Sequence, residues 1–470
     1  MVSEGVRSAE SEIDDGIRRL PVWNGRKTAI LKRLMKIWRD GLELAYMRYG
    51  HAAMFQNNES FEVATVLEQH TSIGAFWCIK WAFEYAKTAS TWKPTDEQLV
   101  KLVSCEGVAY QALVDALKFA TVEGVEIDVD ADSRILTVHE GGNLSGYDHA
   151  IVARDHKSLL VHKQSPLVED SDQLTTRWTA GEYREYWRWL TGIAEAAETE
   201  TILAQAGPLA PRQEMFKRPV VFEAPDPPAR LRNIQEDLTL NQRKIDCGMK
   251  WKLSCYEDCP LVQIGSTTFA ISSVIKALAS VDDYMLRVAA LVDREQYEKV
   301  SGLREERMVA QCRCALDGLG WHVQPHFRLS APEREIDVYS AKGGRDLVIQ
   351  LKSTLRPHSP WEVYKRNSDV LKGINHTAEV LPRFRKGALG FVVTDGYEGD
   401  YATWARSLET CVPVATLQDL DMIAGNPDGA FQILKERAGI TGRPGSKPVS
   451  ERDAEICGWR IRLVDTPKPA

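Results

Sequence analysis

A pair of adjacent glycines, Gly343 and Gly344, constrains the local fold more than any other feature of this chain. The glycines separate two segments, residues 335–340 and 347–354, that have the composition of β-strands. A Gly-Gly pair suits a two-residue hairpin turn because glycine adopts positive φ at little cost. With this turn, cross-strand partners have residue numbers that sum to 687. The sequence therefore predicts an antiparallel hairpin.

The hairpin register also predicts which side chains share a face of the sheet. Successive side chains of a strand point to opposite faces, so one face of the hairpin is expected to be polar and the other aliphatic. The polar face comprises Glu335, Asp337, Gln350 and Lys352, with Asp337 opposite Gln350. A carboxylate, a carboxamide oxygen and an ammonium group make a poor core, and they suit the binding of a hard cation such as Mg²⁺.

The composition of the whole chain bounds its class and its partners. A chain of 470 residues with 44% hydrophobic and 27% charged residues is expected to fold into several globular domains. Its net charge of −7 argues against a protein coated with nucleic acid, although a local basic surface is compatible with an acidic total. No apolar run reaches membrane-spanning length, which predicts a cytoplasmic protein with no membrane partner.

The pattern of residues along the chain predicts its organisation. We expect a large, mainly α N-terminal region with a small β unit, and an α/β domain that follows it. The predicted segments are a helix-rich region at 1–206, a proline-rich linker at 207–230, a helical connecting region at 231–302, the α/β domain at 303–425 and a polar tail at 426–470. Within 303–425 the expected order is α-β-β-β-α-β, followed by α-β.

This order of elements and the placement of five residues in it together resemble a known superfamily. Glu305 is placed on the first helix, Asp337 on the second strand and Gln350-Leu351-Lys352 on the third. The arrangement resembles the PD-(D/E)xK nucleases over about residues 303–420, most closely the Mrr-like branch, in which glutamine replaces the usual acid. The resemblance implies a restriction-endonuclease-like αβββαβ core, a Mg²⁺-dependent endonuclease acting on DNA, and a setting in antiviral defence.

The chemistry of phosphodiester hydrolysis assigns roles to these residues. Asp337 is expected to be the charged ligand of Mg²⁺, or of Mn²⁺ in its place, with Gln350 and the backbone carbonyl of Leu351 as neutral ligands. Lys352 is expected to position the attacking water or to stabilise the charge of the transition state. Because Gln350 is uncharged, a further acid is expected, and Glu305 and Glu335 are the two candidates. Glu305 is favoured because it is spaced to share a helix face with core residues.

A segment after the third strand has the composition of a nucleic-acid-binding loop. Cations and rings alternate in it, which suits a phosphate backbone and exposed bases. The candidate contacts are Arg356, His358, Trp361, Lys365 and Arg366. The alternative is a solvated surface loop anchored by its tryptophan.

Other readings of the sequence stay open. A nuclease fold that has lost activity would act as a nucleic-acid-binding or regulatory scaffold, and the neutral Gln350 keeps this alternative in view. The sequence does not distinguish DNA from RNA. It also leaves open a homo-oligomer and a ligand or protein partner for the N-terminal region.

Overall fold

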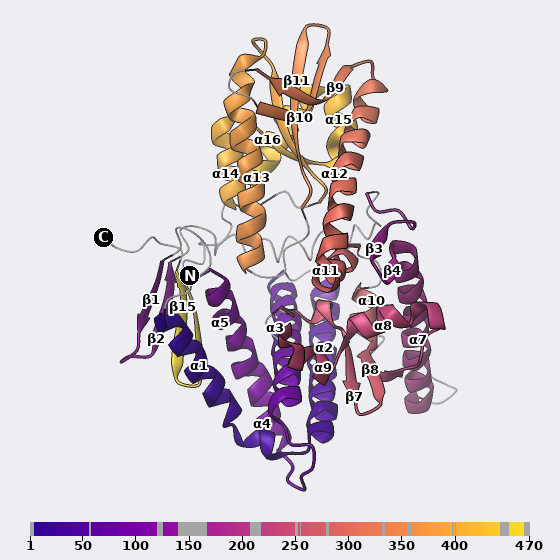
Figure 1. The fold of residues 1–470 in the computed structure, drawn as a ribbon, viewed down its shortest axis with the longest axis vertical. Helices are drawn as coiled ribbons and strands as arrows, with labels where there is room; N and C mark the ends of the chain where they lie inside the picture. Colours follow the sequence, from indigo (N-terminus) through magenta and orange to yellow (C-terminus); the bar gives the residue numbers. More distant parts are fainter. Residues whose placement is uncertain are drawn as a thin grey trace. The chain divides into compact units, whose positions relative to one another are not determined.

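The structure is a computed structural model whose chain forms two compact units (Figure 1). The first unit lies within Met1–His139, Asp155–Tyr297 and Arg452–Leu463, and described residues of the second lie within Glu298–Glu451. The described residues are 4–55, 58–119, 126–139, 167–206, 218–249, 252–253, 255–278, 282–330, 334–354, 360–396, 399, 401–441 and 451–464. Along the described residues, no helix is both long and apolar enough to cross a membrane.

Helices dominate the first unit, as the periodicity of the sequence predicts. The two longest N-terminal helices pack together, and the indole Nε1 of Trp38 donates to the Ser72 hydroxyl at 3.0 Å between them. Their shared core contains the fully buried Trp77 and Trp81. The helices are α1 (Glu4–Arg18), α2 (Lys27–Phe55), α3 (Asn58–Tyr85), α4 (Asp96–Lys101), α5 (Val108–Phe119), α7 (Ala180–Ala206), α8 (Arg232–Leu238), α9 (Gln242–Lys244), α10 (Ser272–Leu278) and α11 (Asp282–Val292).

A four-stranded sheet of the first unit contains both early and late parts of the chain. Strands β1 (Glu126–Asp130) and β2 (Ile135–His139) form the predicted small β unit, and β15 (Trp459–Val464) and β14 (Glu451–Ile456) extend it in the order β1-β2-β15-β14. The prediction of a polar tail at 426–470 is therefore wrong. Strand β15 alternates buried and less buried residues, with Trp459 and Ile461 at 2% and 0% exposure. This alternation is the pattern of a strand in a sheet with one buried face.

A second sheet of the first unit corrects the predicted linker and connecting region. Strand β5 (Val221–Ala224) lies inside the predicted linker 207–230 and pairs with β8 (Thr267–Ile271). The sheet order is β5-β8-β7-β6, with β7 at Leu261–Ile264 and β6 at Thr239–Leu240. Residues 231–302 are therefore mixed α/β and not a helical connector. Residues 207–217 of the predicted linker lie outside the described residues. A shorter two-stranded sheet pairs β3 (Gln173–Thr175) with β4 (Trp178–Thr179).

The second unit is built on a five-stranded mixed sheet in the order β13-β12-β11-β10-β9. Strand β10 is antiparallel to both of its neighbours, β9 and β11, whereas β11, β12 and β13 run parallel. The element order follows the predicted α-β-β-β-α-β-α-β. The elements are α12 (Arg294–Asp317), β9 (His322–Leu329), β10 (Arg334–Lys342), β11 (Arg345–Lys352), α13 (Pro360–Val380), β12 (Leu389–Thr394), α14 (Tyr401–Thr410), β13 (Val414–Thr416), α15 (Leu420–Gly425) and α16 (Pro427–Thr441).

Helix α13 covers the parallel part of this sheet. Its buried Val370 and Ile374 pack on Val392 and Val414 of the two last strands. Figure 1 shows the sheet between α12 on one side and α13 and α14 on the other. Helix α16, which falls in the predicted tail, belongs to this unit because Phe431 contacts the ring of Phe391 edge-on at 6.3 Å. The α/β domain therefore extends beyond the predicted boundary at 425.

Candidate functional site at the β10–β11 hairpin

The hairpin of β10 and β11 has the predicted turn and register. Gly343 and Gly344 have φ values of 56° and 82°, which non-glycine residues rarely adopt. The cross-strand pairing runs from Lys342–Arg345 at the turn to Val338–Ile349, and the residue numbers of each pair sum to 687. The register prediction is confirmed over this length.

Asp337 lies where the two strands part. Its carboxylate oxygen Oδ2 accepts a hydrogen bond from the Leu351 amide at 2.6 Å and another from the Gln350 side-chain amide Nε2. In a regular hairpin the Leu351 amide would donate to a backbone carbonyl of β10. Here it donates to the Asp337 side chain instead. In an extended strand the N–H and C=O of one residue point toward the same neighbour, so the Leu351 carbonyl also faces this position.

The surroundings of Asp337 set its ionisation. Burial raises the pKa of the carboxyl, and the negative charge of Glu335 raises it further. The Leu351 amide and the positive charge of Lys352 oppose this shift and lower the pKa. The net direction is upward, so the site disfavours an isolated carboxylate and would be stabilised by a cation. Asp337, Gln350 and Lys352 are thus brought together as predicted.

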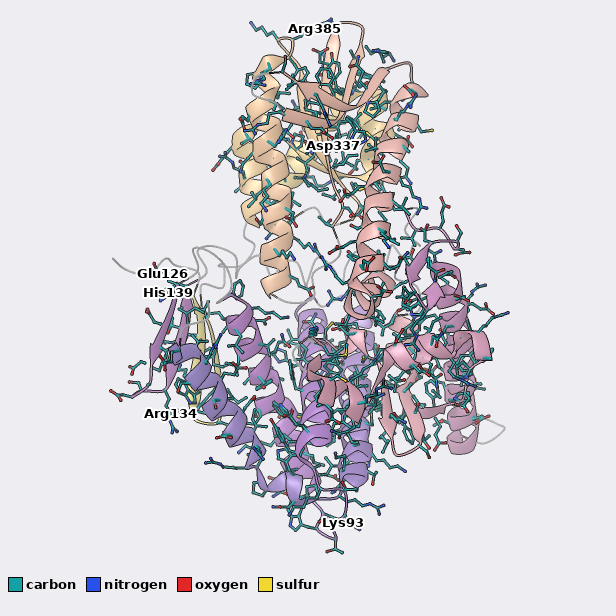
Figure 2. All side chains as sticks on the ribbon, in the orientation of Figure 1. Lys93, Glu126, Arg134, His139, Asp337 and Arg385 are labelled. Carbon is teal, nitrogen blue, oxygen red and sulfur yellow. The ribbon has the colours of Figure 1, made fainter. Side chains whose placement is uncertain are left out.

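Lys352 is half-buried at the end of β11, and α13 passes close to its stem. A Cβ on Gly373 would lie 3.3 Å from Lys352 Cε, tighter than most contacts of this kind. Glycine at this helix position leaves room for the lysine side chain. Figure 2 shows Asp337 among the strands of this unit.

The helix acid is not where the sequence predicted it. Glu305 is exposed and lies in the middle of α12, whereas Arg304 is 2% exposed and shares the buried face with Met308 and Cys312. Residues 304, 308 and 312 are spaced by four, which places them on one face of the helix. The assignment of Glu305 to the core face is therefore wrong, and a buried cation occupies that face.

Arg304 neutralises a buried carboxylate that holds the end of β11. Its guanidinium pairs with Asp395, whose side chain is 3% exposed and directly follows β12. The other oxygen of Asp395 accepts from the Thr354 amide at 2.7 Å, and the Ser353 hydroxyl also donates to Asp395 at 3.2 Å. Since Ser353 and Thr354 directly follow Lys352, this network fixes the backbone beside the lysine.

A histidine of β9 lies next to Asp337 on the other side. The β9–β10 pairs have residue numbers that sum to 663, as in Ile336–Phe327 and Val338–Pro325, so His326 is opposite Asp337. His326 has a φ of 49°, a strained conformation for a residue with a side chain. Its Nδ1 lies 3.2 Å from Glu335. Its Nε2 lies 3.7 Å from the carboxylate of Glu306. Glu306, and not Glu305, is therefore the acid of α12 that His326 contacts.

A second histidine, His376, approaches the site from α13. Its Nε2 is buried and has no hydrogen-bond partner in the described part of the chain. Burial lowers the pKa of His376, and the positive charges of Arg334 and Lys352 lower it further. The net shift is downward and favours the neutral imidazole. Neither histidine is among the residues predicted from the sequence, although the pairing of β9 with β10 places His326 opposite Asp337.

The predicted nucleic-acid loop is partly helical. Helix α13 begins at Pro360, so the exposed Lys365 and the half-buried Arg366 lie on a helix and not on a loop. The side chain of Trp361 and residues Arg356 and His358 lie outside what the structure describes.

The donor groups suit a cation that keeps much of its water. Within the described ranges, no group of three or more His, Cys, Asp or Glu side chains could hold a metal. The available oxygens are the Asp337 carboxylate, the Leu351 carbonyl and the Gln350 carbonyl, which would face the ion after the amide rotates by half a turn. Mg²⁺ is commonly held by one or two carboxylates together with water and substrate phosphate, so these residues fit it. Glu335 is exposed and bonded to His326, and its carboxylate is a further oxygen donor.

Comparisons with known proteins assign no family to the chain. No family model matches the sequence, and no curated protein matches it. Among solved structures, protein VC1899 from Vibrio cholerae is similar at 12% sequence identity, over 66% of this chain and 69% of that one, with a TM-score of 0.18. A similarity of this size carries no argument about fold or function.

Proposed function

We propose that this chain is a metal-dependent endonuclease of the PD-(D/E)xK type that hydrolyses phosphodiester bonds in DNA. The observation that carries the proposal is the half-buried Asp337, bonded to Gln350 and the Leu351 amide and lying close to the charge of Lys352. The mixed sheet and its order of elements support a restriction-endonuclease-like core. A cytoplasmic setting and a role in defence against foreign DNA follow from the Mrr-like resemblance alone.

The residues of the chain have separable roles in this chemistry. A bound Mg²⁺ or Mn²⁺ would supply an activated water and neutralise charge on the phosphate. Asp337 and the neutral oxygens of Gln350 and Leu351 would hold that ion. Lys352 would hold the attacking water or the phosphate oxygens through its ammonium group, and Gly373 leaves space for its stem.

One feature favours the inactive scaffold as a second candidate. The amide of Gln350 donates to Asp337, which satisfies the carboxylate without any ion. A protein that had lost catalysis could keep this bond, while an active enzyme must break it when the metal binds. The two candidates therefore differ in whether divalent cations act on this site.

The test is to incubate the purified chain with circular and linear DNA in the presence of Mg²⁺, Mn²⁺ or a chelator. We expect cleavage with either cation and none with chelator. The variants Asp337→Ala and Lys352→Ala should each abolish cleavage and leave the circular dichroism spectrum unchanged. Matched controls are Asp369→Ala, a half-buried acid of α13 that pairs with Lys372, and Lys342→Ala at the other end of β10. Equal cleavage by wild type and Asp337→Ala would overturn the proposal, and no cleavage under any condition favours the scaffold.

A further inference from the structure

The connection from α13 to β12 presents a basic segment whose sequence is Arg-Phe-Arg-Lys, residues 383–386. The three cationic residues are exposed, whereas Phe384 is half-buried. Gly387, with a φ of 89°, ends the segment by turning the chain toward β12. The segment is in the same compact unit as Asp337 and Lys352.

Two contacts fix the backbone of this segment. The ring of Phe384 stacks on Tyr339 of β10 at 5.2 Å between centroids and 23° between planes. The amide of Arg385 donates to Asp346 at 3.2 Å, and Asp346 also accepts from the Tyr339 hydroxyl at 3.1 Å. Asp346 is 2% exposed. The segment is thus held to the sheet through its backbone and its aromatic ring, which leaves its charged side chains directed away from these anchors.

The positive charges of Arg385 and Lys386 in this segment are not neutralised nearby. Within the described part of the chain, the side chains of Arg385 and Lys386 form no hydrogen bond and no ion pair. The adjacent acid, Asp346, is buried and already bonded. Figure 2 shows Arg385 at one end of this unit, extending outward from the ribbon. Fixed, unpaired cations on a chain of net charge −7 indicate a surface that binds a polyanion.

The distance between segment 383–386 and Lys352 is short enough for one DNA duplex to contact both. Gly373 packs against Lys352, and Arg383 follows it ten residues later along α13 and the turn after it. At 1.5 Å per residue of helix, this separation is about 15 Å. Along β11, the six residues from Asp346, which accepts from the Arg385 amide, to Lys352 span about 20 Å at about 3.3 Å per residue. Successive phosphates of one DNA strand rise about 3.4 Å along the axis, so this range corresponds to about four to six base pairs.

We propose that segment 383–386 binds the phosphate backbone of double-stranded DNA about four to six base pairs from the bond placed at Lys352. The inference rests on the proposed nuclease function and specifies its substrate as a duplex that extends past the cleaved bond. It assigns to this segment the phosphate contacts that sequence analysis sought in the loop after β11.

The test measures the salt dependence of DNA binding for Arg385→Ala/Lys386→Ala. Binding of a 30-base-pair duplex is followed by fluorescence anisotropy, and chelator is present so that no cleavage occurs during the titration. The slope of log affinity against log salt is negative, and each lost phosphate contact reduces its magnitude by about 0.9. We therefore expect the magnitude of the slope to fall by about 2 in this variant. Arg383 is left in place because it makes another interaction. The conservative variant Arg385→Lys/Lys386→Arg should keep the wild-type slope.

A matched control removes the same charge from the other unit. Lys93 and Lys101 are exposed, and Lys93→Ala/Lys101→Ala should leave the slope unchanged. An unchanged slope in the Arg385/Lys386 variant, or an equal fall in the control, overturns the proposal. The proposal is also overturned if the Arg385→Ala/Lys386→Ala variant keeps the wild-type slope on duplex DNA but binds an acidic peptide more weakly than wild type does. If the slope falls but wild type never cleaves DNA, the binding surface stands and the nuclease assignment fails.

Discussion

The buried pair of Arg304 and Asp395 provides a sharp test of how the end of β11 is held. Replacing Arg304 by methionine keeps most of the side-chain volume and removes the charge. Asp395, whose side chain is 3% exposed, would then lose its ion pair with Arg304. Breaking a buried ion pair by removing one partner costs about 3–5 kcal/mol, because the remaining charge is left uncompensated.

The expected size of the local effect follows from this cost. Thr354 donates its amide to Asp395 at 2.7 Å, so that amide reports the opening of the strand end beside Lys352. Each 1.4 kcal/mol corresponds to about tenfold in an equilibrium, so hydrogen exchange at Thr354 should accelerate by about 10² to 4 × 10³ if it occurs by this opening. Cleavage should fall because opening at Ser353 and Thr354 releases Lys352.

Hydrogen exchange followed by mass spectrometry of peptides that cover residues 350–356 measures this change. The double variant Arg304→Met/Asp395→Asn removes both charges and retains an oxygen for the Thr354 amide. It should recover about 1–3 kcal/mol relative to the single variant. The control Arg184→Met breaks a buried pair with Asp282 in the other unit, and Thr354 should exchange at the wild-type rate. Wild-type exchange in Arg304→Met, or no recovery in the double variant, would refute the reasoning.

Two further predictions concern the carboxylate site. Because burial raises the pKa of Asp337, its protonated form stabilises the fold; this stabilisation is complete below the unfolded pKa of about 3.9 and is lost as the pH rises through the folded pKa. Asp337→Asn should therefore raise the melting temperature at pH 7 in chelator and lose this advantage near pH 3, and an advantage that persists at pH 3 would contradict the cause. Gln350→Glu should tighten Mg²⁺ binding in calorimetric titrations, because a second carboxylate beside Asp337 is stabilised by the ion, and equal or weaker binding would argue against Gln350 as a ligand.

The hairpin was predictable because its information is local. A glycine pair at positive φ and alternation on both sides define one register, and that register places Asp337 beside Gln350. The same reasoning extended to β9 leads to His326. The prediction of the α/β element order succeeded for a similar reason, since each element carries its own periodicity.

The parts that sequence analysis missed depend on contacts between distant segments. Asp395 pairs with Arg304 across 91 residues, and no local pattern marks either residue as buried. A spacing of three from Glu305 to Met308 is compatible with one helix face, yet the buried face is the one spaced by four that includes Arg304. Strands β5 and β15 pair with partners far along the chain, so their short segments have the local pattern of a linker and a tail.

We propose that Asp337 and Lys352 act with a divalent cation in the hydrolysis of phosphodiester bonds. The decisive measurement is single-turnover cleavage of a labelled duplex by wild type and by Asp337→Asn, purified in parallel and assayed with Mg²⁺. We expect cleavage by wild type that chelator abolishes, and a rate at least about a hundredfold lower in the variant, in line with the loss of one group that stabilises the transition state. Cleavage at the same rate by both proteins, or by wild type in chelator, would contradict it.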